Sequence, residues 1–377
     1  MRILITGASG FIGSFIVSEG LNRGYEVWAG VRATSSRQYL TDPRTHFAEL
    51  DLGNPERLRQ QLTQLRQQMG GPWDYVIHAA GATKSLRREG FFRTNTEGTK
   101  NLVTALEECQ MRPARFVFVS SLSIFGAIKE QPAAPDSPSV ERPFGPSASF
   151  VTRHSSSAPD SSFVTRHSSL IYPSITDADT PRPNTAYGES KLAAEQWLRQ
   201  QTSLPWVILR PTGVYGPRER DYFLMAKSIS QHVDFAVGYR PQEITFVYVL
   251  DVVQAVFLAC ERPEADVLHR AFFLSDGQSY SSRAFSDLLQ REMGVRHVLH
   301  IKAPLWFLRA VCAVNGTICQ RLGRLTTLNM DKYHILAQRN WNCDITPARR
   351  HLGYEPQWSL PDGVRESVRW YKEAGWL

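Results

Sequence analysis

Three glycines near the start of the chain constrain its fold more than any other feature of the sequence. Gly7, Gly10 and Gly13 follow the apolar stretch Arg2–Thr6 and precede a helical pattern of apolar residues. A strand, a glycine turn and a helix are therefore predicted in that order. Glycines at this spacing let the backbone approach a diphosphate, to which the helix N-terminus presents free N–H groups. The alternative is a tight turn that binds nothing. We expect the phosphates beside four residues of the turn, Ser9, Gly10, Phe11 and Ile12.

Short apolar runs alternate with amphipathic segments through the first half of the chain. The runs, each bounded by turn residues, lie at 26–31, 75–78, 116–120 and 207–210, and amphipathic segments at 55–69 and 96–108 separate several of them. Strands that alternate with helices form parallel sheets with helices on both faces. The sequence therefore predicts the α/β class, with a doubly wound parallel sheet of the Rossmann type and a smaller C-terminal substrate lobe.

The domain boundaries follow from the place where this alternation weakens, just past Tyr215. We expect a dinucleotide-binding Rossmann domain at residues 1–214, to which a helix and a strand return within about residues 245–275. Residues 215–377 should form mainly the substrate-binding lobe. We expect this lobe over the carboxyl edge of the sheet, because ligands bind at that edge in open α/β folds.

A proline- and serine-rich segment at about residues 132–183 interrupts the pattern. It holds nine of the 22 prolines and a direct repeat, in which residues 149–156 recur as residues 162–169. Two copies are too few for a solenoid, and a segment with so few apolar residues cannot bury enough surface to offset its ordering entropy. We therefore predict a mobile insertion. The alternative is a lid or docking motif that uses Arg153 and Arg166.

Composition excludes several classes of protein. The five cysteines form no Cys-x-x-Cys pair and no metal-ligand spacing with the ten histidines, so no metal site and no disulfide framework are expected. The net charge of +7 comes from scattered Lys and Arg residues, which argues against nucleic-acid binding. The start of the chain leaves no room for a signal peptide, and no stretch is long and apolar enough to span a membrane. A cytoplasmic protein is expected.

The residue after the second predicted strand bears on the choice of cofactor. A carboxylate at this place normally accepts a hydrogen bond from the adenosine ribose of NAD. Here the residue is Arg32, which can instead pair with a 2′-phosphate, so NADP(H) is favoured and NAD(H) remains possible. The alternative is a solvated surface arginine. Further cofactor contacts are expected from residues that follow other strands, namely Asp51, Leu52, Ala79, Ala80 and Gly81.

Tyr187 and Lys191 lie four residues apart, and hence on one face of a predicted helix. A nearby ammonium favours the phenolate and lowers the pKa of a tyrosine from its reference value of about 10. Such a pair is common by chance. Its occurrence after a glycine turn, and after Ser120 and Ser121 at the end of a fifth strand, indicates an acid/base site.

Together these motifs resemble the extended short-chain dehydrogenase/reductase family, which includes the NAD-dependent epimerases and dehydratases. The resemblance covers nearly the whole chain, with the motifs in the family's order. They lie at residues 6–13, 78–81, 95 with 98–99, 120–121 with 125–126, 187–191 and 210–217, and residues 344–354 are similar to its C-terminal signature.

The resemblance implies a role for each member of the site. Tyr187 would be the catalytic acid/base, Lys191 would lower its pKa and bind the nicotinamide ribose, and Ser121, five residues before Gly126, would hydrogen-bond the reacting oxygen. Asn95 would brace the helix, or would be a plain helix residue. The remaining expected contacts are Pro211 and Thr212 for the cofactor, and Ser123, Gly213 and Arg218 for the substrate.

Departures from the family's patterns bear on the substrate. Leu122 and Ser123 stand where the sugar-nucleotide dehydratases carry an Asp-Glu pair, so dehydration is not expected. Gly213 stands where many nucleotide-sugar enzymes carry an Asn that contacts the substrate. With this glycine, the segment at residues 210–217 is similar to that of the hydroxysteroid dehydrogenase branch. Against this, four basic residues of the expected lobe can hold a diphosphate, namely Arg218, Arg220, Lys227 and Arg240.

The apolar stretch at residues 305–322 has two interpretations, a buried helix, which we favour, or a wall or membrane-facing helix for a lipid-like substrate.

Three functions are compatible with these residues. The first is an NAD(P)-dependent oxidoreductase that moves a hydride between nicotinamide C4 and a secondary alcohol or ketone. The second is a nucleotide-sugar 4-epimerase with tightly bound NAD, and the third is a non-catalytic NADP(H) sensor. The partner is a small-molecule substrate, and by analogy with the family the chain forms a homodimer through the helix that carries Tyr187.

Overall fold

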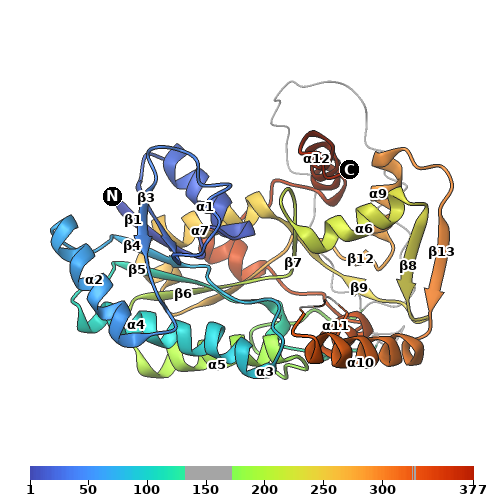
Figure 1. Ribbon diagram of the computed structural model, residues 1–377, viewed down its shortest axis with the longest axis horizontal. Coiled ribbons are helices and arrows are strands. Elements are labelled where there is room, and N and C mark those ends of the chain that lie inside the picture. The colour runs from blue at the N-terminus through green and yellow to red at the C-terminus, as the bar shows by residue number, and fades with distance from the viewer. Residues whose placement is uncertain (132–171, 325, 327) are drawn as a thin grey trace.

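A seven-stranded parallel sheet forms the centre of the molecule (Figure 1). The computed structural model describes residues 1–131 and 172–377, apart from residues 325 and 327. Neighbouring strands run in the order β11 (Ala271–Leu274), β6 (Trp206–Pro211), β5 (Arg115–Val119), β4 (Tyr75–His78), β1 (Arg2–Thr6), β2 (Glu26–Val31) and β3 (His46–Glu49). The predicted doubly wound sheet is thereby confirmed, including the strand that returns at residues 271–274.

Helices cover both faces of the sheet. One layer holds α1 (Phe11–Asn22) and α7 (Val249–Glu261), and the other holds α2 (Pro55–Met69), α4 (Gly98–Glu108) and α5 (Ala186–Gln201) (Figure 1). Local sequence sets their ends: in α2, Asn54 caps the first turn, and Gly70 ends the helix at φ 72°. A short helix, α3 (Arg88–Phe91), and a π-helical turn (Phe92–Glu97) lead into α4.

The second lobe lies beyond the carboxyl edge of the sheet. It contains α6 (Arg220–Ser230), β8 (Val233–Val237), β9 (Glu243–Ile244), β12 (Tyr280–Ser281), α9 (Ala284–Met293), β13 (Leu299–Ala303) and α12 (Leu360–Glu373). Two short strands, β7 (Gly213–Tyr215) and β10 (Phe246–Tyr248), pair in parallel between sheet and lobe. Tyr215, Phe246 and Phe285 pack against one another there, with ring centroids 5.3 to 6.1 Å apart. The remaining short helix, α8 (Glu264–Val267), precedes β11.

The helical hairpin of α10 (Leu305–Arg321) and α11 (Met330–Ala337) corrects one expectation. The sequence favoured a buried helix at residues 305–322. In the structure Leu308 and Cys312 are the only buried residues of α10, whereas Trp306 is 72% exposed. The error arises because an apolar run indicates a helix without indicating what covers it. No helix of the described chain is long and apolar enough to cross a bilayer.

The end of the proline- and serine-rich insertion corrects a second expectation. We predicted a mobile segment to about residue 183, but Tyr172 and Ile175 are buried, and Ile175 forms a bridge with Cys343. Asp177 forms an ion pair with the buried Arg210. Residues 172–183 therefore belong to the packed structure. The repeat, with Arg153 and Arg166, lies outside the described residues.

Candidate active site

The carboxyl edge of the sheet gathers the residues that the sequence singles out. Because all strands run in parallel, the segments that follow them meet at one edge. Gly7 to Gly13 follow β1, Arg32 follows β2, and Asp51 and Leu52 follow β3. Ala79, Ala80 and Gly81 follow β4, Ser121 and Ser123 follow β5, and Thr212 and Gly213 follow Pro211 at the end of β6.

The glycine turn leaves room for a ligand at the start of α1. Gly7 has a φ of 71°, and a Cβ atom there would lie 2.7 Å from Ala80 Cα, so only glycine fits. The Gly10 N–H donates to the Gly7 carbonyl at 2.9 Å, which closes the turn. Within the described residues no side chain caps the first turn of α1. Its free N–H groups and close backbone approach fit a dinucleotide diphosphate.

The end of β4 is held by a buried histidine. His78 makes hydrogen bonds with Thr6 at 2.7 Å and with Thr99 at 2.9 Å. Burial, assisted by the charge of Lys191, lowers the pKa of His78 to about 3, so the ring is neutral at physiological pH. His78 therefore ties β1, β4 and α4 together, and fixes the start of the loop that continues to Gly81.

Tyr187 and Ser121 meet at the end of β5. Ser121 is the N-cap of a short 3₁₀ turn (Leu122–Ile124), where its Oγ accepts the Ser123 N–H at 3.2 Å. Tyr187, on the first turn of α5, faces Ser121 closely enough for the two hydroxyls to interact. Burial raises the pKa of the Tyr187 phenol, and the interaction with Ser121 acts in the opposite direction. The structure thus reverses the lowered pKa that the sequence predicts for Tyr187.

Lys191 lies one helical turn farther along α5 and is buried. Its Nζ donates to the Val119 carbonyl at 2.9 Å and lies 4.8 Å from the centroid of the Phe118 ring. A Cβ at residue 81 would lie 3.1 Å from this Nζ, so Gly81 leaves room for it. Burial lowers the pKa of Lys191 to about 8, against the opposing charge of Glu195.

Two contacts position α5, and the sequence analysis missed the first of them. Glu195 forms a buried ion pair with Arg210 of β6, at 2.7 Å. Asn95 donates to Ser190 Oγ at 2.9 Å and accepts the Ala82 N–H at 2.7 Å, which confirms its bracing role. The sequence did contain a signal for the first contact, because an arginine inside an apolar strand requires a partner.

The three expected substrate residues have different surroundings. Ser123 Oγ is buried without a hydrogen-bond partner among the residues that the structure describes, which fits a ligand contact. At Gly213 a Cβ would collide with the Tyr222 hydroxyl. Its neighbour Thr212 donates to the Thr245 carbonyl at 3.0 Å.

The Arg218 side chain is held against α1, which follows the glycine turn. Its guanidinium donates to Ser14 Oγ at 2.9 Å and lies 4.2 Å from the Phe15 ring and 4.5 Å from the Tyr39 ring. Three contacts on α1 and on the segment after β2 thus hold the side chain that we expected to meet substrate. Its role as a substrate contact stays a prediction. Arg220, Lys227 and Arg240 are exposed.

The residues expected around the adenosine lie at the surface. Arg32 is exposed, and its backbone N–H donates to Ser35 Oγ at 3.0 Å. Arg37 stacks over Phe47, with 4.1 Å between guanidinium carbon and ring centroid. Asp51 lies 3.8 Å from the Arg57 guanidinium. Arg32 is therefore free of ion pairs within the described chain and accessible to an added phosphate.

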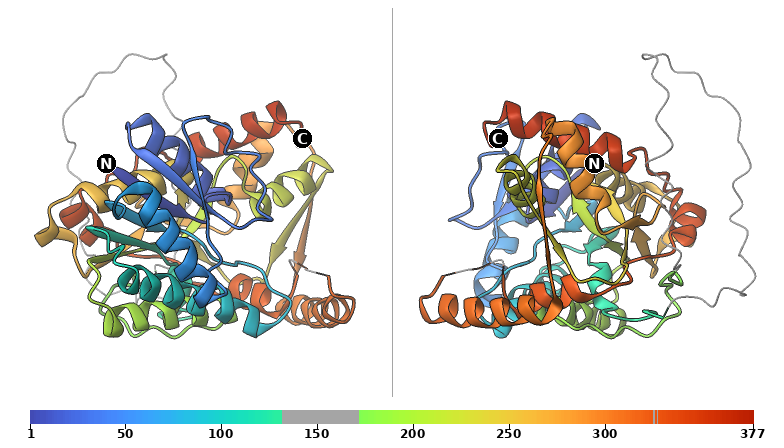
Figure 2. Two further views of the ribbon diagram at one scale, coloured as in Figure 1. Left: turned by 60° about the vertical axis from the view of Figure 1, so that its left-hand side comes forward. Right: turned by 90° about the vertical axis from the view of Figure 1, so that its right-hand side faces the viewer.

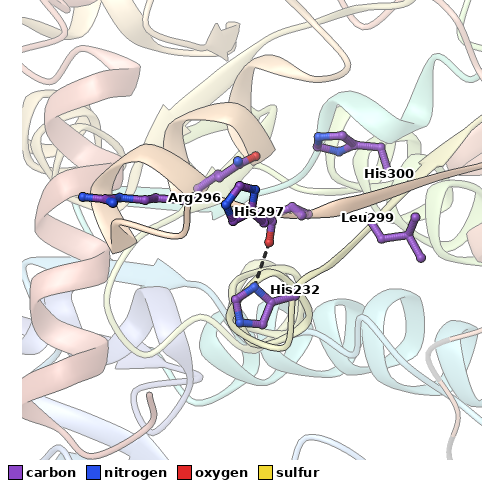
Figure 3. A pocket seen from close by; sticks show the side chains of 7 residues that line it. His232, Arg296, His297, Leu299 and His300 are labelled. Carbon is purple, nitrogen blue, oxygen red and sulfur yellow. Dashed lines mark hydrogen bonds between the residues drawn. The ribbon is translucent and has the colours of Figure 1, made fainter.

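A separate surface hollow of about 470 Å³ lies in the second lobe (Figure 3). His232, Arg296 and His297 are among the residues that line it, and His232 makes a hydrogen bond with the His297 carbonyl at 2.7 Å. None of the expected catalytic residues lines this hollow.

Comparison with known proteins agrees with this geometry. The sequence profile of the NAD dependent epimerase/dehydratase family matches residues 3–154 and 155–274. The chain belongs to this family. It is 23% identical to a 3-beta-hydroxysteroid dehydrogenase of Mycolicibacterium neoaurum, over 99% of this chain and 92% of the relative. A ceramide reductase of Caulobacter vibrioides is 22% identical over 100% of this chain and 96% of the relative.

The fold also matches that of solved family structures. UDP-glucose 4-epimerase of Thermotoga maritima superposes with a TM-score of 0.67 at 19% identity, covering 99% of each chain. The protein is thus an NAD(P)-dependent epimerase/dehydratase-family enzyme of the oxidoreductase type, as its sequence motifs indicated.

Proposed function

We propose that this family member is a dehydrogenase/reductase that transfers a hydride between NADP(H) and a secondary alcohol or ketone. One observation carries the proposal: the Tyr187 side chain lies close enough to Ser121, at the carboxyl end of β5, to interact with it, one helical turn from the Lys191 ammonium. An acid, a second hydrogen-bond donor and a cation are the groups that carbonyl reduction requires.

The cofactor would occupy the sheet edge. The free N–H groups at the start of α1 would hold its diphosphate, Arg32 its 2′-phosphate and Lys191 its nicotinamide ribose. When bound, the nicotinamide supplies or accepts the hydride. Arg32 supports NADP(H) over NAD(H), because an arginine cannot accept a hydrogen bond from a ribose hydroxyl.

The chain's own residues handle the proton. In the reductive direction, Tyr187 donates its phenolic proton to the carbonyl oxygen as negative charge develops on it, and Ser121 donates a second hydrogen bond to that oxygen. Burial raises the pKa of Tyr187 and so keeps the phenol protonated at neutral pH. A protonated phenol is the form that reduction needs.

An apolar carbonyl compound is the substrate class that these features support. The buried Leu122 follows Ser121, where dehydration would need an acid/base pair. Arg218 is held by α1, which weakens the case for a diphosphate-binding substrate site. The relatives named for hydroxysteroid dehydrogenation and ceramide reduction also support an apolar substrate.

Identification of the cofactor tests the proposal first. The purified protein is denatured, any nicotinamide released is identified, and the emptied protein is titrated with NADPH and NADH. We expect weak retention and tighter binding of NADPH. Consumption of NADPH in proportion to ketone reduced would then support the reductase. Tightly retained NAD, with no net turnover, would instead identify a 4-epimerase, and binding without turnover of any substrate would identify a sensor.

We also propose that the enzyme is a cytoplasmic homodimer, on the family resemblance and the cysteine pattern. Sedimentation velocity of the full chain tests the dimer, and cell fractionation tests the location. A monomer at working concentration would overturn the first of these.

A further inference from the structure

Helix α10 exposes a stripe of large apolar side chains. Helical spacing places them on one face, because successive members lie seven, four and four residues apart. The stripe consists of Phe307 (49% exposed), Val314 (60%), Ile318 (52%) and Leu322 (64%), where Leu322 directly follows the helix. Trp306, next to Phe307, is 72% exposed. We call these five residues the α10 stripe.

The opposite part of α10 provides the packing. Leu308 and Cys312 are its buried residues, and the helix contacts α11. A hollow of about 400 Å³ along the exposed side is lined by Ala310, Val311 and Val314, among others. Single exposed apolar residues are ordinary on protein surfaces, but a contiguous stripe of this kind marks an interaction site.

The charges along α10 share one sign. Helix α10 and the residues that link it to α11, 305–329, contain no Asp or Glu, but three basic residues, Arg309, Arg321 and Arg324. Arg309 and Arg321 lie on α10 itself and are exposed. A helix with Trp and Phe on an apolar face and Lys or Arg beside it is typical of binding in the interface of an anionic bilayer.

We propose that α10 docks on an anionic lipid surface, with the α10 stripe inserted at the level of the headgroups. The helix has 17 residues and does not qualify as a membrane span, so it lies on the bilayer and does not cross it. A second copy of the chain is a poorer partner. A two-fold pairing through α10 would bring Arg309 and Arg321 toward their own equivalents, with no acidic residue in this segment to compensate.

Helix α11, which packs on α10, contacts the start of α5, the helix that carries Tyr187. In α11, the Asp331 carboxylate accepts the Ala186 N–H at 3.3 Å, one residue before Tyr187. Lys332, also in α11, lies 3.6 Å from Asp221 of α6. Figures 1 and 2 show α10 and α11 along the lower edge of the molecule, beside α3 and α5. A docked α10 therefore brings the start of α5 toward the lipid. The proposal itself does not depend on the reaction that Tyr187 performs.

Vesicle sedimentation tests the proposal on the full-length protein. Vesicles of phosphatidylcholine alone are compared with vesicles that also contain phosphatidylglycerol, at low and high salt. We expect co-sedimentation with the anionic vesicles, weakened by salt. The double variant Trp306→Ser/Ile318→Ser should weaken the partition coefficient by at least about tenfold, since each substitution removes a large apolar side chain from the interface. The control Leu224→Ser removes an apolar side chain of similar exposure (48%) on α6, and should bind normally.

Charge reversal gives an independent test. Arg321→Glu should weaken anionic binding by about tenfold, because it removes one attraction and adds one repulsion. Arg66→Glu, in the last turn of α2, is the matched control and should have no effect. If Arg321→Glu and Arg66→Glu lowered binding to anionic vesicles equally, the proposal would be wrong. It would also be wrong if the parent protein bound neither kind of vesicle. A change in molar mass of the Trp306→Ser/Ile318→Ser variant in light scattering, without lipid binding by the parent, would identify a second copy as the partner.

Discussion

The carboxyl edge of the sheet, which we call the catalytic edge after the proposed function, differs from helix α10 in which side chains it buries. Each departs from the usual pattern of apolar side chains inside and charged side chains outside. At the edge, two cationic side chains are buried and both have partners: Lys191 donates to Val119, and Arg210 pairs with Glu195. On α10, apolar groups lie at the surface with basic residues around them. Buried charges and exposed apolar patches are the informative exceptions in a folded chain. The buried cations of the edge are thus stabilised by partners within the fold. The exposed apolar side chains of α10 have no such partners among the described residues, and the proposed lipid surface would cover them.

The largest expected effect is the loss of the phenol. Tyr187→Phe removes the proton donor and should lower turnover by about 10²–10⁴-fold, with cofactor affinity within a few-fold. Stopped-flow NADPH oxidation and a fluorescence titration measure the two quantities. Tyr239→Phe, at an exposed tyrosine of the second lobe, is the control. Unchanged activity of Tyr187→Phe would show that Tyr187 is not the proton donor and that this edge is not the catalytic site.

Glu195→Gln tests whether the edge depends on its buried ion pair. The substitution leaves the buried Arg210 guanidinium poorly compensated and should cost about 3 kcal/mol of the free energy of unfolding. Urea unfolding measures this cost. Glu373→Gln, on the exposed part of α12, should cost little. If Glu195→Gln and Glu373→Gln lowered the free energy of unfolding equally, the buried ion pair would stabilise the fold no more than an exposed one.

Arg32→Asp tests the exposed border of the edge. Loss of a charge-assisted contact with the 2′-phosphate should weaken NADPH relative to NADH by about 10–100-fold. The ratio of the two dissociation constants is measured by fluorescence titration. An unchanged ratio would remove the argument for NADP(H) and leave Arg32 as a solvated surface residue.

The pH dependence of cofactor binding reports on Lys191. Its pKa of about 8 means that the ammonium loses its proton between pH 7 and pH 9, so cofactor affinity should fall by about tenfold over that range. Because the same group titrates at 10.5 when unperturbed, the unfolded chain binds more protons between pH 8 and 10.5, and Lys191 makes stability rise with pH there. Lys191→Arg should make affinity independent of pH. A flat profile in the parent protein would contradict the assignment.

The smallest effect is expected on α10. Trp306→Ala should change the free energy of unfolding by less than about 0.5 kcal/mol, since the side chain is 72% exposed. Leu308→Ala, two residues away and buried, should cost about 2–3 kcal/mol. A large loss in the free energy of unfolding for Trp306→Ala would mean that this side chain stabilises the fold. The α10 stripe would then not be free for an external partner.

The sequence predicted the sheet and its edge well, for a physical reason. A glycine turn after Thr6 and alternating apolar runs specify parallel strands, and parallel strands bring their following segments together without further information. The strand Ala271–Leu274 lies within the segment, about residues 245–275, in which a strand was expected to return to the sheet. Tyr187 and Ser121 meet as expected, although 66 residues of sequence separate them.

Features that depend on what covers a surface were not predictable. The apolar pattern of residues 305–322 is the same for a helix under a lobe and for a helix at the surface. The raised pKa of Tyr187 reflects burial by distant segments, which spacing within one helix does not reveal. Similarly, the composition of residues 132–183 hid the buried Tyr172 and Ile175 among prolines and serines.

The ion pair of Asp177 with Arg210 bears on how this enzyme can change in length. Arg210 also holds Glu195 of the catalytic helix, so the chain is fastened again ten residues before Tyr187. The free-energy cost of closing a flexible loop grows by only about 0.6 kcal/mol per doubling of its length. A segment fastened at its far end can therefore gain a duplicated stretch, such as the repeat offset by 13 residues, while the acid/base pair keeps its place.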